Sequence, residues 1–147
     1  MLRFTDVPRP AVALGAAGLL PALACLGAVL FGPADWRDQV FLIGTLYAAV
    51  ILSFLGGTWW ARSCTHTPQS ELTPLLAFSV IPPLAAWVAA FFLNRASLIV
   101  MAALFIAGLA VDRRLLKLGL APSWWFNLRL PLSAGMALLS LLIALAA

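Results

Sequence analysis

The stretch AAVILSFLGGTWWARS, residues 48–63, decides the fold class. It is uncharged as far as Arg62, and it ends with two glycines, two tryptophans and that arginine. An uncharged run of this kind is typical of a helix in the hydrocarbon core of a membrane, whereas tryptophan and arginine are typical of the lipid–water boundary. The stretch therefore predicts a membrane-spanning helix that reaches the boundary near Arg62.

The composition of the whole chain extends this prediction. Of its 147 residues, 64% are hydrophobic and 10% are charged, whereas soluble domains carry about 25% charged residues. So few charges cannot cover the surface of a soluble domain, and we expect an integral membrane protein. The net charge of +4 comes from Lys and Arg near the ends of apolar segments. This placement favours the lipid bilayer as a partner and gives no reason to expect nucleic acid.

Five apolar segments approach or exceed the length of about 20 residues that a membrane-spanning helix needs. Turns rich in polar residues or proline separate them, among them Gly32-Pro33-Ala34-Asp35 and Asn94-Arg95. We expect an all-α integral membrane protein, with five transmembrane helices in one compact bundle and a single domain over residues 1–147. The predicted helices cover approximately residues 11–31, 39–61, 73–93, 96–118 and 127–146.

The basic residues predict how the chain is oriented. With five spans, the side that holds the N-terminus and the second and fourth loops carries most of the Lys and Arg residues. By the positive-inside rule, we expect the N-terminus inside and the C-terminus outside, in a multi-pass membrane protein. The inner set is Arg3, Arg9, Arg62, Arg113, Arg114, Lys117 and Arg129, and the outer set is Arg37 and Arg95.

A stripe of small side chains marks the second segment. Thr45, Ala49, Ser53 and Gly57 recur every four residues, and Gly56 widens the stripe. Small residues let membrane helices approach one another closely. Two interpretations stay open: this is the central helix of the bundle, or the stripe is a docking face for a membrane-protein partner, a second copy or a ligand.

Aromatic and basic residues gather at the inner ends of the segments. Indole rings prefer the depth of the lipid head groups, so the tryptophans can form an interfacial belt. Alternatively, they line a pocket in which guanidinium groups stack on indole faces and hold an anionic head group. The candidate residues for binding a lipid or ligand are Trp59, Trp60, Arg62, Asp112, Arg113, Trp124, Trp125 and Arg129.

Asp112 adjoins this basic set, and a carboxylate at the end of a membrane segment should not lie unpaired. The candidate partners are Arg62, Arg113 and Arg129. Acid–base catalysis by Asp112 with His66 is a weaker alternative, because two isolated titratable groups form no recognised catalytic arrangement. Cys64 and His66 offer two metal ligands where zinc needs three or four, so we expect no metal site, no cofactor and no catalytic residue.

Pro82 and Pro83 interrupt the third segment. Consecutive prolines remove helix hydrogen bonds, and in lipid the freed carbonyl groups must be covered by neighbours. We expect a bend that shapes the bundle, with a hinge or the wall of a ligand cavity as the alternative.

Several of these motifs resemble those of a known family. The run YAAVILSFLGG, residues 47–57, with the following tryptophans resembles the signature of an uncharacterised membrane family of unknown function that includes mitochondrial transmembrane protein 69. Three further parts of the chain are similar to that family: Pro8-Arg9-Pro10, the segment around Asp112, and Pro122-Ser123-Trp124-Trp125. The chain departs from the family at Thr58, Trp59 and Trp60, where the family often has His or Arg. The resemblance implies an energy-transducing membrane, which we expect to be a bacterial inner (plasma) membrane, but it implies no activity.

Two functions are predicted. The first is a structural, accessory or assembly component of a larger membrane complex, which small-residue helix faces and the lack of charge in the middle of each segment favour. The alternative is a binder or carrier of a lipid or other apolar small molecule with an anionic head at the inner interface. The same lack of charge argues against proton relays and ion-coupled transport.

Overall fold

The structure, a computed structural model, describes residues 7–65 and 67–146, and within these ranges it is entirely helical, with short turns. Five stretches are long and apolar enough to cross a membrane: Arg9–Phe31, Ala34–Ser63, Gln69–Phe92, Arg95–Lys117 and Trp125–Ala146. The prediction of an all-α protein with five membrane-spanning segments is thereby confirmed. In chain order the elements are α1 (Arg9–Ala17), α2 (Leu20–Phe31), the 3-10 turn η2 (Ala34–Trp36), α3 (Arg37–Ser63), α4 (Gln69–Phe92), α5 (Arg95–Lys117) and α6 (Trp125–Ala146).

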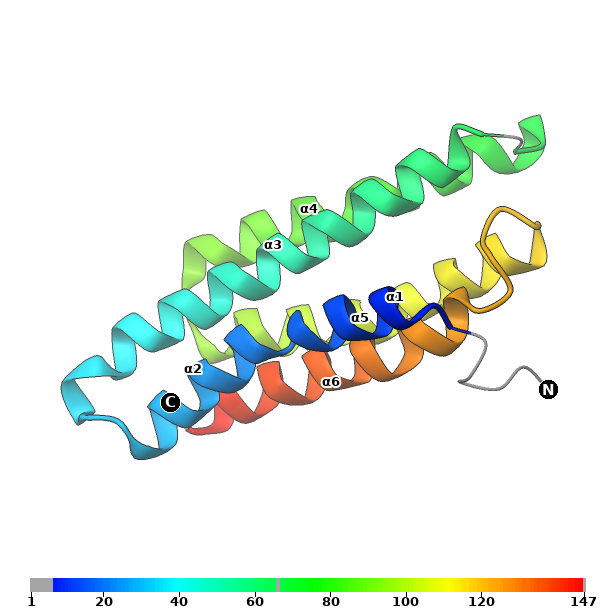
Figure 1. Cartoon of the computed structure of the whole chain (residues 1–147). Coiled ribbons are helices and arrows are strands. Elements are labelled where there is room, and N and C mark those ends of the chain that lie inside the picture. Colours follow the sequence, from blue (N-terminus) through cyan, green and yellow to red (C-terminus); the bar gives the residue numbers. More distant parts are fainter. Residues whose placement is uncertain (1–6, 66, 147) are drawn as a thin grey trace.

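The spans run back and forth as two hairpins with an N-terminal pair beside them (Figure 1). Helices α3 and α4 form one hairpin, α5 and α6 form the other, and α2 packs against α3 and α6. We call the end of the bundle where α3 and α5 finish and α1, α4 and α6 begin the basic end, because it carries Arg9, Arg62, Arg113, Arg114, Lys117 and Arg129. Arg37 and Arg95 lie at the opposite end. Arg3 and His66 lie outside the described residues.

The first predicted helix is divided into α1 and α2 by a turn at Gly18 and Leu19. Pro21 lies in the first turn of α2 and has no N–H to donate to the carbonyl of Ala17, so the helix is interrupted there. The hydroxyl of Tyr47 on α3 donates a hydrogen bond to the carbonyl oxygen of Gly18 at 2.5 Å. This bond ties the turn to the second span and satisfies a carbonyl that lipid could not.

Helix α4 continues without a break through Pro82 and Pro83. Because Pro83 has no N–H, the carbonyl of Ser79 lacks the helical hydrogen bond that residue 83 would otherwise donate to it. A Cβ atom added to Gly56 of α3 would lie 2.3 Å from that carbonyl oxygen and 2.9 Å from Cδ of Pro83. Glycine therefore permits the close approach of α3 to α4 at the proline pair. A hinge at the prolines stays a prediction.

The small-residue stripe of α3 winds from the core to the surface. Thr45 is fully buried and Ala49 is half-buried, whereas Ser53 and Gly57 are exposed. A four-residue spacing drifts around a helix that has 3.6 residues per turn. The buried face of α3 is instead formed by Gly44, Thr45, Ala48, Leu52, Leu55, Gly56, Trp59 and Ser63.

Candidate functional site

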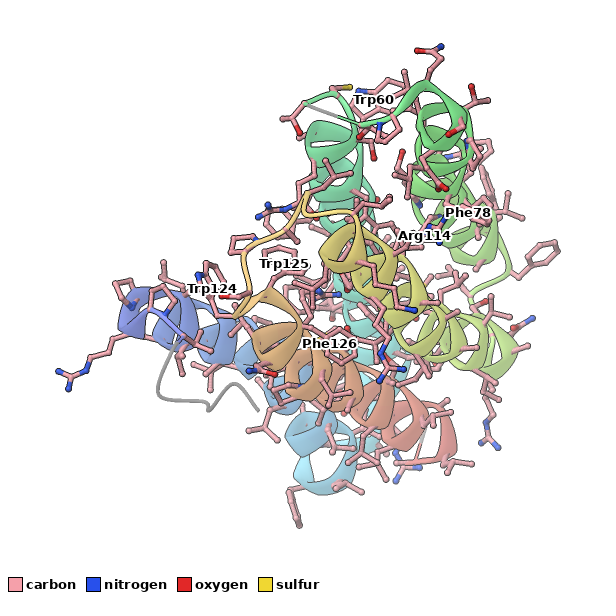
Figure 2. All side chains as sticks on the ribbon, turned by 90° about the vertical axis from the view of Figure 1, so that its right-hand side faces the viewer. Trp60, Phe78, Arg114, Trp124, Trp125 and Phe126 are labelled. Atoms are coloured by element: carbon pink, nitrogen blue, oxygen red, sulfur yellow. The ribbon has the colours of Figure 1, made fainter. Side chains whose placement is uncertain are left out.

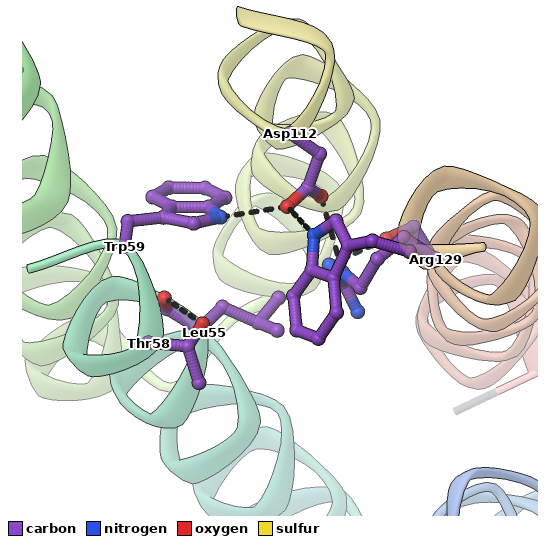
Figure 3. A network of polar contacts seen from close by, with 7 residues as sticks. Leu55, Thr58, Trp59, Asp112 and Arg129 are labelled. Carbon is purple, nitrogen blue, oxygen red and sulfur yellow. Dashed lines mark hydrogen bonds and ion pairs between the residues drawn. The ribbon is translucent and has the colours of Figure 1, made fainter. Parts of the chain in front are cut away.

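A fully buried carboxylate lies at the centre of the basic end. The side chain of Asp112 on α5 is 0% exposed. Its Oδ1 atom accepts hydrogen bonds from the indole N–H of Trp59 at 2.9 Å and from that of Trp125 at 2.8 Å. Its Oδ2 atom accepts one from Nε of Arg129 at 3.1 Å (Figure 3). Asp112 therefore joins α3, α5 and α6 through three donors, and we call these four residues the Asp112 cluster.

Arg129 is also buried, with 6% of its surface exposed. Besides its ion pair with Asp112, its Nη2 atom donates a hydrogen bond to Oγ of Ser133 at 2.9 Å. Buried charges are tolerated when they are paired and hydrogen-bonded. Of the three arginines that the sequence offers as partners of Asp112, the structure pairs it with Arg129, and both charges are neutralised inside the protein.

Glycine on α5 makes room for the Trp59 ring in this cluster. A Cβ atom at Gly108 would lie 2.7 Å from Cη2 of Trp59. Gly108 stands one helical turn before Asp112, so the indole lies across that gap and reaches the carboxylate. Trp59 is 1% exposed whereas its neighbour Trp60 is 47% exposed. Of this neighbouring pair, Trp59 is thus a core residue, and Trp60 is placed as a belt residue would be.

Arg62 bonds to the turn between α5 and α6. Its Nη1 atom donates a hydrogen bond to the carbonyl of Leu120 at 3.1 Å, and its guanidinium carbon lies 4.4 Å from the ring centroid of Trp125. Trp124, which is half-buried, lies beside Trp125 with 6.1 Å between ring centroids. A guanidinium group does stack on an indole at this end, and the contact fastens the turn between α5 and α6 over the cluster.

Three other cations at the end of α5 face outward. Arg114, which Figure 2 labels, lies at this end of the bundle. It forms a two-point ion pair with Glu71 of α4, in which Nε donates to Oε2 at 3.2 Å and Nη2 donates to Oε1. The guanidinium of Arg113 lies 5.1 Å from the ring centroid of Phe126. Within residues 7–65 and 67–146, neither Arg113 nor Lys117 forms an ion pair with a carboxylate. Their charges are therefore available to an anion from outside.

Two grooves flank α5 at this end. The α5–α6 groove has a volume of about 540 Å³ and is lined by Ile106, Leu109, Ala110, Arg113, Arg114, Lys117, Phe126 and Leu130. The α4–α5 groove has a volume of about 550 Å³. Its lining includes Trp59, Glu71, Phe78, Pro82, Ala107 and Arg114. Both volumes lie within the range of about 300–1,000 Å³ that is typical of small-molecule sites.

The predicted binding residues are thus divided among several roles. Asp112, Trp125 and Arg129 belong to the cluster, and Arg62 and Trp124 flank it. Arg113 lines the α5–α6 groove and Trp59 also lines the α4–α5 groove. The candidate set omits Arg114, Lys117 and Glu71, which also line the grooves. The four-residue spacing of Arg113 and Lys117, with Leu109 one turn earlier, is the signal that could have found the α5–α6 groove.

Catalysis by Asp112 with His66 stays a prediction, because His66 lies outside the described residues. In the described part of the chain, no group of three or more His, Cys, Asp and Glu side chains is placed to hold a metal ion. Cys25 is buried and Cys64 is exposed, and both are free thiols. The polar geometry at this end suits binding and packing.

Comparison with known proteins gives a family and several relatives, two of which are described below. The family model described as "Protein of unknown function (DUF3429)" matches residues 7–146. Transmembrane protein 69 of Xenopus tropicalis is 31% identical over 125 residues, which are 84% of this chain and 49% of that protein. Transmembrane protein 69 of Mus musculus is 27% identical over 141 residues, or 95% of this chain and 57% of that protein. The chain spans about half the length of these curated relatives, and no solved structure matches it. The resemblance inferred from the motifs is confirmed.

Proposed function

We propose a function for this chain, which belongs to the DUF3429 family of multi-pass membrane proteins of unknown function. From the geometry of its basic end, we infer that it binds an anionic membrane lipid there. The observation that carries this proposal is the α5–α6 groove, where Arg113 and Lys117 adjoin an apolar surface. This is the alternative function predicted from the sequence. The proposed site shares Arg113 with the predicted residues. It does not include Arg62 and Arg129, whose guanidinium groups already bond to other parts of the chain.

The groove offers separate surfaces for the two parts of a lipid. From Lys117 to Ile106 it extends along α5 for about 16 Å, at 1.5 Å per residue. The cations lie at the end of the helix, where a phosphate head group would be, and Ile106, Leu109 and Leu130 lie deeper. Guanidinium groups bind phosphate oxygens through paired hydrogen bonds. The contact of Arg113 with the Phe126 ring holds its guanidinium group at the rim of the groove.

The orientation and location of the chain belong to the same proposal. The excess of basic residues at one end supports an inside position for that end and for the N-terminus. Cytoplasmic leaflets are rich in anionic lipids, and each basic residue near such a surface contributes about 1 kcal/mol to binding. A bacterial inner membrane is proposed on this basis, while the two named relatives come from eukaryotes.

Lipid retention in native mass spectrometry tests the proposed site. The chain would be reconstituted with equal amounts of phosphatidylglycerol and phosphatidylcholine that carry the same acyl chains, and then extracted mildly. The wild type should retain phosphatidylglycerol. The double variant Arg113→Gln, Lys117→Gln should lose about 2 kcal/mol of affinity, roughly 30-fold.

The double variant Arg37→Gln, Arg95→Gln is the matched control, because it removes two cations from the opposite end. Its retention of phosphatidylglycerol should equal that of the wild type. Equal retention of both lipids by the wild type, or the same loss in both double variants, would contradict the proposal.

An accessory role in a larger membrane complex is the second candidate that we propose. It is supported by the outward position of Ser53 and Gly57 on α3, where a Cβ atom at Gly57 would meet nothing within 4 Å. A helix of a partner protein or of a second copy could approach closely there. Gly57→Leu should then release a partner that the wild type retains after mild solubilisation. A wild type that is strictly monomeric and without partners would count against this role.

A further inference from the structure

We propose that the α4–α5 groove is a second binding site, which takes a neutral lipid of the surrounding membrane, with a long apolar chain and a polar but uncharged head group. Its walls are α4 and α5, and Trp59 of α3, whose side chain is almost fully buried, also lines it. Apart from the pair of Arg114 and Glu71 at the basic end, the groove is lined by apolar residues. The charged residues of this groove therefore lie at its basic end.

The groove continues toward the opposite end of the bundle. A further hollow of about 580 Å³ lies between the same two helices and shares Ile81 with the α4–α5 groove. Its lining reaches Asn94 and Ser97 at the start of α5. From Arg114 to Ser97 the seam extends along α5 for about 25 Å, close to the hydrocarbon thickness of about 30 Å. A chain of considerable length can thus lie along it.

The pair of Arg114 and Glu71 selects against a charged head group. Both carboxylate oxygens of Glu71 accept hydrogen bonds from Arg114, so the pair carries no net charge. The side chain of Glu71 is 24% exposed and that of Arg114 is 51% exposed. The neutral pair offers a phosphate or an ammonium group no net charge that would offset the cost of removing that group from water. A hydroxyl or ester group can bond to the exposed edges of the pair and leave it intact.

The two grooves therefore differ in charge although Arg114 lines both. On the α5–α6 side, Arg113 and Lys117 have no carboxylate partner among the described residues, which favours an anion. On the α4–α5 side, Glu71 cancels the charge of Arg114. The neutral-lipid site is independent of the proposed anionic-lipid site, since different residues and different head groups decide each.

Photolabelling in vesicles tests the inference. The full chain would be placed in phosphatidylcholine vesicles with either diacylglycerol or phosphatidic acid, both carrying the same photoactivatable acyl chain. Labelled residues would be mapped by mass spectrometry. Diacylglycerol should label the facing sides of α4 and α5 at least about fivefold more than phosphatidic acid does. Equal labelling by the two probes would indicate bulk lipid only and would overturn the proposal.

A matched pair of variants on α5 sharpens this test. Ala107 lines the groove, so Ala107→Phe should fill it and lower diacylglycerol labelling by at least about fivefold. Ala103, one turn earlier, is also exposed but does not line the groove, so Ala103→Phe should leave labelling unchanged. Undiminished labelling in an Ala107→Phe protein that melts like the wild type would overturn the proposal.

Competition on the wild type keeps the inference testable if Ala107→Phe does not fold. Excess unlabelled diacylglycerol should suppress labelling of the groove, and excess phosphatidic acid should not. Competition by both lipids, or by neither, would overturn the proposal. Phosphatidic acid labelling along the α5–α6 groove reports on the other site separately, so the failure of one proposal is distinguishable from the failure of the other.

Discussion

The Asp112 cluster and the α5–α6 groove are built from the same last turns of α5. The charges of the cluster are buried and neutralised, whereas those of the groove are exposed. In the cluster, a carboxylate that is 0% exposed accepts three hydrogen bonds and is neutralised by a buried arginine. In the groove, Arg113 and Lys117 are exposed and have no carboxylate partner in the described part of the chain. One residue along a helix is a rotation of about 100°, and here that step separates a closed structural contact from an open binding surface.

The same step divides two other pairs of neighbours, both on α3. Trp59 is buried in the cluster and Trp60 faces outward. Gly56 lies against α4, and a Cβ at Gly57 would meet open space. In each pair the two residues share a chemistry or a sequence motif, and only their position around the helix distinguishes them. Substituting both members of a pair identically tests which side of α3 faces the core.

The largest effect is expected at Asp112. Asp112→Asn removes the charge that neutralises Arg129 and leaves a buried cation unpaired, which should cost about 3–5 kcal/mol in the free energy of unfolding. Chemical unfolding in detergent, followed by tryptophan fluorescence, would measure the loss. Arg113→Gln, at the neighbouring exposed position, should stay within about 0.5 kcal/mol of the wild type. Equal stability of the two variants would refute the burial of Asp112.

A smaller loss is expected at Trp59. Trp59→Phe keeps a ring in the gap beside Gly108 but removes one hydrogen bond to the Asp112 carboxylate. Hydrogen bonds to charged groups contribute about 1.5–3 kcal/mol, so the same unfolding measurement should show a loss of that size. Trp60→Phe should have little effect because its ring is half exposed. If Trp60→Phe were the more damaging change, α3 would be rotated from the orientation described.

The glycine pair gives the smallest expected change in stability. Gly56→Ala places a Cβ atom against the Ser79 carbonyl and Pro83, and overpacking of this kind typically costs about 1–3 kcal/mol. Gly57→Ala adds a methyl group in open space and should be neutral or stabilising by up to about 1 kcal/mol, because alanine favours helix. Thermal unfolding of the two variants side by side measures the difference. Losses of equal size would mean that α4 does not approach Gly56 as described.

The spans could be predicted from the sequence, because uncharged stretches of about 20 residues have few alternatives to crossing a bilayer. The rotation of each helix could not. In a soluble helix the apolar stripe marks the buried face, whereas a membrane helix is apolar on all sides. The four-residue stripe from Thr45 to Gly57 therefore indicated a face that the helix leaves partly uncovered. For the same reason, the sequence did not show that Arg129 would be enclosed while Arg113 stayed exposed.

The break in the first span was also missed, although the sequence carries a local signal for it. Gly18 and Pro21 mark the place where α1 ends and α2 begins, yet the uncharged run around them favoured one continuous helix.

The pairing of Glu71 with Arg114 joins residues from different hairpins. It depends on how α4 and α5 lie together, which spacing along the chain does not specify.

The most direct test of the central claim is the melting temperature of the protein as phosphatidylglycerol is added to it in neutral detergent. A ligand that binds the folded state raises stability, and a gain of about 2 kcal/mol should raise the melting temperature of a chain of this size by roughly 5 °C. The wild type and the Arg37→Gln, Arg95→Gln control should both show this rise, and the Arg113→Gln, Lys117→Gln variant should not. An equal rise in all three proteins would contradict the assignment of the α5–α6 groove as the lipid site.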